Sequence, residues 1–67
     1  MSTAYDEIYI AALLDAAKSR EVGVGNRRLT ANEFRSLCMP DINAGYALEV
    51  QEAERRYFKT HAEGREP

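Results

Sequence analysis

Very few residues of this chain have the types and spacing that catalysis or metal binding requires. Cys38 is the only cysteine and His61 the only histidine among the 67 residues. A thiol becomes a nucleophile only beside a base or a cation, and a structural zinc site needs four ligands. We therefore predict no catalytic residue, no metal site and no cofactor. We interpret Cys38 as a buried structural thiol and His61 as a capping or interface residue near a helix end.

Two further patterns are weaker candidates for chemistry. The segment 23–28, Gly-Val-Gly-Asn-Arg-Arg, has some of the glycines of a dinucleotide-binding loop, but that motif follows a strand and opens a helix. Here it follows a predicted helix, so we interpret it as a helix terminator and a turn. The carboxylates of Glu49, Glu52 and Glu54 are interpreted as a solvated face, because nothing nearby separates their pKa values.

A cluster of arginines is the strongest candidate binding site. A basic segment lies between two acidic ones, and its arginines are Arg20, Arg27, Arg28 and Arg35. They are compatible with a solvated loop containing internal ion pairs, with contact to an acidic protein surface, or with contact to nucleic-acid phosphates. A nucleic-acid-binding domain usually has a clearly basic balance, whereas this chain has a net charge of −2. We therefore prefer a protein partner over nucleic acid.

The arginines must be positioned by helices, and the first of these is unusually apolar. A helix over about residues 4–20 places apolar side chains on roughly 200° of its circumference at ~100° per residue, whereas a surface helix needs a stripe only a little over ~100° wide. A chain of 67 residues also has a thin stability margin on its own. We therefore predict a homodimer whose interface is formed by Tyr9, Ile10, Leu13, Leu14 and Ala17.

The rest of the chain gives two more helices. A glycine loop is predicted over 22–29, where the alternation of Val22 and Val24 leaves a short hairpin open. Thr30 and Glu33 have the spacing of a capping box that opens a short helix over about 31–38, and Pro40 is expected to end it. A last helix is expected over about 42–62, followed by a frayed tail over 63–67.

Together these features predict a single all-α domain over residues 1–67. Its two long helices are expected to be antiparallel, with a short helix between them, and to dimerise into a helical bundle. The function we expect is a non-catalytic adaptor or inhibitor that regulates another, unidentified protein, as small phage-encoded factors do. The alternative is a DNA-binding transcriptional regulator that uses the arginine cluster. The lone thiol, the lack of a signal-peptide pattern and the lack of a span of ~20 apolar residues predict a cytoplasmic protein without membrane contact.

Overall fold

The chain folds into three α-helices. The computed structural model describes the backbone of residues 4–65 and the side chains of residues 4–59. Helix α1 spans Glu7–Gly23, α2 spans Ala31–Asn43 and α3 spans Ala47–Arg65. The predicted all-α class is confirmed. No strand occurs within residues 4–65, so the segment between α1 and α2 is a loop and not a hairpin.

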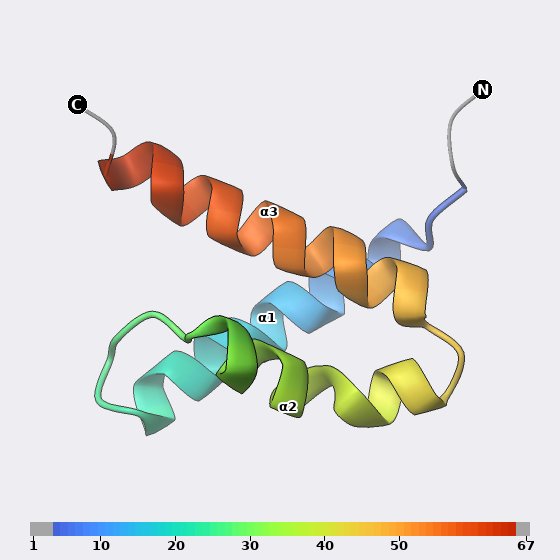
Figure 1. Cartoon of the computed structure of the whole chain (residues 1–67), viewed down its shortest axis with the longest axis horizontal. Helices are drawn as coiled ribbons and strands as arrows, with labels where there is room; N and C mark the ends of the chain where they lie inside the picture. Colours follow the sequence, from blue (N-terminus) through green and yellow to red (C-terminus); the bar gives the residue numbers. More distant parts are fainter. Residues whose placement is uncertain (1–3, 66–67) are drawn as a thin grey trace.

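Helix α3 packs against both other helices, and α2 runs back from the end of α1 to the start of α3 (Figure 1). Helix α2 has 13 residues and runs back towards the start of α1, so the chain direction is reversed before α3 begins (Figure 1). Helices α1 and α3 therefore run in the same general direction. Consistent with this, the start of α1 contacts Glu49 and its last turns contact Tyr57. The antiparallel pair expected from the sequence is not found.

Helix α1 begins later than its sequence pattern predicts. Its N-cap is Asp6, whose carboxylate accepts a hydrogen bond of 3.0 Å from the backbone N–H of Tyr9. A side chain in this position satisfies one of the backbone donors that a helix start leaves free. The hydroxyls of Ser2 and Thr3 are also of the type that caps helices, but both residues lie outside the described residues.

The loop between α1 and α2 is closed by the turn residues that the sequence indicates. Gly25 and Asn26 both have positive φ, 91° and 63°, a conformation that few residues other than glycine and asparagine adopt readily. Helix α2 then opens on the predicted capping box. Thr30 accepts from the backbone N–H of Glu33, and the Glu33 carboxylate accepts from the backbone N–H of Thr30. Both hydrogen bonds of the predicted capping box are therefore present, and the prediction is confirmed.

The prediction that Pro40 ends α2 is wrong. The helix continues through Pro40 to Asn43. A proline inside a helix leaves the carbonyl four residues earlier without its bond, and here that residue is Ser36, which is exposed to water. Beyond the proline, Asp41 accepts a hydrogen bond from the Tyr9 hydroxyl and Ile42 packs against the core. These tertiary contacts offset the local cost of the proline.

The break expected at the proline occurs instead at Gly45. Its φ of 100° is left-handed, and its N–H donates to the carbonyl of Ile42. A residue in this conformation is a common helix terminator. Helix α3 therefore starts at Ala47 rather than near residue 42, and it continues to Arg65 through most of the predicted tail.

The core is formed by all three helices and the first loop. Its largest fully buried side chain is Phe34 of α2. The Phe34 ring lies 5.2 Å from the ring of Tyr57 and 6.0 Å from that of Phe58, measured between centroids. The buried set is Ile10, Leu13, Ala17, Leu29, Phe34, Cys38, Val50, Ala53 and Tyr57. A 67-residue chain thus builds a continuous core without a second copy.

Candidate functional site

A groove lies between the C-terminal half of α1 and helix α2. One hollow of about 270 Å³ is lined by Arg20, Gly23, Val24, Asn32, Glu33 and Ser36. A second hollow of the same size shares Arg20 and Gly23 with it and adds Ala16, Ser19 and Leu37. No residue of α3 lines either hollow, because α3 packs on the other side of the α1–α2 pair. We call these two hollows together the α1–α2 groove.

The groove has a mixed lining and one cation without a partner. Arg20 is exposed and forms no ion pair with any side chain of residues 4–59. The other charged residue of the lining, Glu33, is held by Arg27 through two hydrogen bonds of 2.9 and 2.7 Å. The Arg27 guanidinium, and then the capping bond from Thr30, lower the pKa of Glu33 to about 2. Arg20 is therefore the charge that a bound carboxylate would meet.

The four arginines predicted to form one binding surface are not equivalent. Arg27 is paired with Glu33, and Arg35 lies 3.7 Å from the carboxylate of Glu54 on α3. Arg20 lines the groove, and Arg28 belongs to the loop near Tyr57. Arg20 and Arg28 have no carboxylate partner within the part of the chain that has described side chains. Of the interpretations drawn from the sequence, internal ion pairing applies to Arg27 and Arg35.

The residues predicted to form a dimer interface lie largely inside a single chain. Ile10, Leu13 and Ala17 are buried, with Leu13 only 5% exposed, and Leu14 is partly buried against the core. Tyr9 is half-buried, and its ring stacks on that of Tyr46 with centroids 3.8 Å apart. Helices α2 and α3 thus cover most of the apolar surface that was attributed to a second copy. The physical reason for placing a dimer interface at these five residues does not hold.

The opposite side of α1 is open. Ala12, Ala16 and Ser19 are exposed along its middle, and Ile8 and Val22 are 84% and 67% exposed. At ~100° per residue, Ile8, Asp15 and Val22 fall on one edge of this face, and Arg20 falls on the other edge, beside α2. We call the face formed by these residues the outer face of α1. It was not identified from the sequence, although the seven-residue spacing of Ile8, Asp15 and Val22 is a signal that a heptad search detects.

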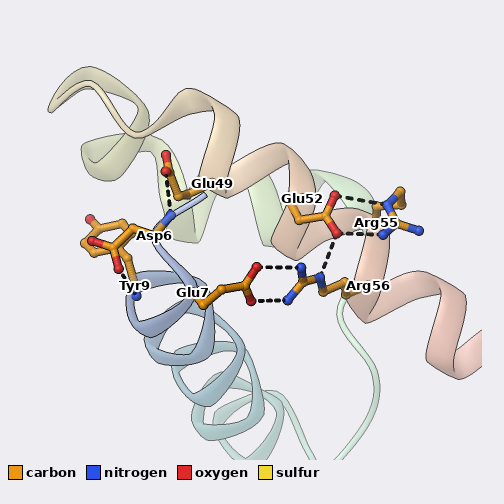
Figure 2. Close-up of polar contacts among 7 residues, drawn as sticks. All are labelled: Asp6, Glu7, Tyr9, Glu49, Glu52, Arg55 and Arg56. Carbon is orange, nitrogen blue, oxygen red and sulfur yellow. Dashed lines mark hydrogen bonds and ion pairs between the residues drawn. The ribbon is translucent and has the colours of Figure 1, made fainter. Parts of the chain in front are cut away.

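A network of ion pairs fixes the start of α1 to α3 (Figure 2). Arg56 donates to Glu7 at 2.8 and 3.1 Å and to Glu52 at 2.6 Å, and Arg55 donates to Glu52 at 3.1 and 2.6 Å. Asp6 adds a backbone bond to Glu49 at 3.1 Å. Glu52 is buried, not part of a solvated face, and Arg55 and then Arg56 lower its pKa to about 2. These side chains therefore stabilise the packing of α1 against α3.

The thiol contributes no chemistry to the described site. Cys38 is fully buried in the core, and burial raises the pKa of its thiol to about 11, so it is not a reactive thiolate at neutral pH. His61 lies outside the residues with described side chains. Within those residues, no group of three or more metal-ligating side chains is close enough together to hold an ion.

Comparison with known proteins gives no match to a family, to a curated protein or to a solved structure. Function is therefore argued from the geometry of this chain alone. Over the described residues, none of the helices has the length and apolar character needed to cross a membrane.

Proposed function

We propose that this chain is a non-catalytic protein-binding module, an adaptor or inhibitor that regulates the protein it binds. The observation that carries the proposal is the α1–α2 groove together with the outer face of α1. They form one continuous side of the molecule, free of α3, with exposed apolar side chains and the unpaired Arg20. Exposed apolar side chains around a concave surface are typical of interaction sites.

The shape of this surface favours a helix as the bound element. Helix-binding grooves lie between helices and take apolar anchors at i, i+3, i+4 and i+7. Addition of an extended strand requires a free sheet edge, which is absent over residues 4–65. Recognition of a proline-rich segment requires an aromatic groove, and no aromatic residue is among those lining the two hollows.

The size and lining of the groove argue against catalysis as the function. Hollows of about 270 Å³ fall just below the ~300 Å³ at which enclosed ligand pockets begin. The lining brings no nucleophile next to a base, because its titratable members are Arg20 and the ion-paired Glu33. For the same reason we assign no cofactor to it. We expect the protein to work in the cytoplasm, where a lone thiol stays reduced.

The distribution of arginines makes nucleic acid the weaker alternative. Phosphate binding needs cations that are free to release counterions, and Arg27 and Arg35 are already paired with carboxylates. Binding to random duplex DNA at low and at raised salt tests this. We expect no binding at low salt. A steep fall of log affinity with log salt would instead favour the DNA-binding regulator.

The proposed surface is tested by two matched substitutions on α1. Ala16→Arg places a long charged side chain in the groove, whereas Ala11→Arg places it on an exposed position of the same helix outside the groove. Both variants should keep the helical content of the parent chain. In capture from an extract of the native host, we expect Ala16→Arg to lose proteins that the parent and Ala11→Arg both retain. Equal capture by all three chains would contradict the proposed surface.

A further inference from the structure

We infer that the α1–α2 groove receives helix α1 of a second copy of this chain, so that two copies form a parallel, twofold pair of α1 helices. The inference rests on the proposed function, because it concerns the same protein-binding surface, for which a second copy would compete with any other protein. It differs from the dimer predicted from the sequence, because it uses the outer face of α1 and leaves Ile10, Leu13 and Ala17 in the core of each copy.

Residues on the outer face of α1 have the spacing of a helix pair. Ile8, Asp15 and Val22 are seven residues apart, and Ala12, Ala16 and Ser19 lie between them and the groove. Taken as a heptad, Ala16 is at position a, Ala12 and Ser19 are at d, Asp15 is at g and Arg20 is at e. All seven of these outer-face residues are exposed in the single chain. A face with this repeat suits a paired helix.

The two edges of the outer face have complementary charges. In a parallel helix pair, position g of one helix faces position e of its mate five residues further along. Asp15 of each copy therefore lies beside Arg20 of the other, and the twofold axis gives two such ion pairs. Asp15 and Arg20 are both exposed, and neither forms an ion pair with a described side chain of its own chain. An antiparallel pair would bring like edges together and set equal charges against each other.

The groove lies beside the Arg20 edge of α1. Arg20 lies on the edge of α1 that faces α2, and it lines both hollows. A helix that pairs along Ala12, Ala16 and Ser19 therefore lies over the groove. The g edge of this second helix, with its Ile8, Asp15 and Val22, then points into the groove. The small side chains along the middle let the helix axes approach closely, and the pairing covers Ile8 and Val22, two of the most exposed large apolar residues of the chain.

The test is sedimentation equilibrium of the full chain, with charge reversals at the two edges. We expect the parent to reach twice the mass of one chain with rising concentration. Asp15→Arg and Arg20→Asp should each raise the dissociation constant by about tenfold, because each reversal turns two attractive pairs into repulsive ones. The double variant should recover most of the affinity. Lys18→Glu, a reversal on an exposed residue of α1 away from the paired edges, should leave the dissociation constant unchanged.

The outcomes separate this inference from the proposed function. Circular dichroism first establishes that each variant is folded. A parent that sediments as one copy at every concentration overturns the inference, as does a folded double variant that associates no better than the single ones. The proposed function would stand in that case if Ala16→Arg still abolished capture of another protein. It would fail together with the inference if Ala16→Arg changed neither capture nor mass.

Discussion

The hydroxyl of Tyr57 accepts a hydrogen bond from the backbone N–H of Leu29, with 2.9 Å between nitrogen and oxygen, and donates one to the carboxylate of Glu21. Both Leu29 and Tyr57 are buried. One phenol thus joins the loop before α2 to the last turns of α1 and to the middle of α3.

Removing this hydroxyl should destabilise the fold. In Tyr57→Phe, the buried N–H of Leu29 loses its acceptor, which costs about 1–3 kcal/mol. Urea denaturation followed by circular dichroism measures the change. Tyr5→Phe is the matched control, because the Tyr5 hydroxyl makes no hydrogen bond with any described residue, and its free energy of unfolding should stay within about 0.5 kcal/mol of the parent. An effect of equal size in both variants would show that the hydroxyl of Tyr57 has no special role.

Leu13 should behave as a core residue of the single chain. Leu13→Ala removes a side chain that is 5% exposed and leaves a cavity, for which we expect a loss of about 2–5 kcal/mol in the free energy of unfolding. The same substitution at the exposed Leu48 should cost less than about 0.5 kcal/mol. The measurement is urea denaturation at low protein concentration. A Leu13→Ala chain as stable as Leu48→Ala would mean that Leu13 is covered only after association.

Acid should weaken the contact between α1 and α3. The pKa of Glu52 is lowered to about 2 in the folded chain, below the ordinary value of 4.5, so the unfolded chain binds the proton more tightly. The stability that Glu52 contributes is therefore full above about pH 4.5 and is lost as the pH falls towards 2. We expect the urea midpoint of the parent to fall between pH 7 and pH 3, and that of Glu52→Gln to fall less. An equal fall in both chains would assign the acid sensitivity to other carboxylates.

The local signals in the sequence predicted local structure well. The Thr30–Glu33 capping box and the turn at Gly25 and Asn26 depend only on side chains and dihedral angles within a few residues, and both are found in the structure. Pro40 failed as a signal because its cost is offset by contacts that are distant in sequence, including the bond from Tyr9 to Asp41. A proline rule contains no information about such contacts.

The candidate site was harder to predict for the same reason. The apolar excess of the first helix is visible in the sequence, but how much of it the chain covers by itself depends on where α2 and α3 pack. Arg20 and Arg27 look alike in sequence, and only the fold shows that Glu33 engages Arg27 and leaves Arg20 unpaired. The groove forms where residues 32–37 of α2 lie beside the C-terminal half of α1, and the sequence pattern of either helix alone does not reveal that packing.

The central claim about association is that the outer face of α1 meets another helix, that of a second copy. Cysteine trapping tests it directly, because Cys38 is buried and stays unreactive. In a parallel pair, equivalent residues at the a and d positions face each other within the ~7 Å between Cα atoms that a disulfide spans, and Ala12 and Ser19 are at d. Mild oxidation should therefore link two chains in both Ala12→Cys and Ser19→Cys, but not in Ala11→Cys. Failure of Ala12→Cys and Ser19→Cys to link any better than Ala11→Cys would contradict the account.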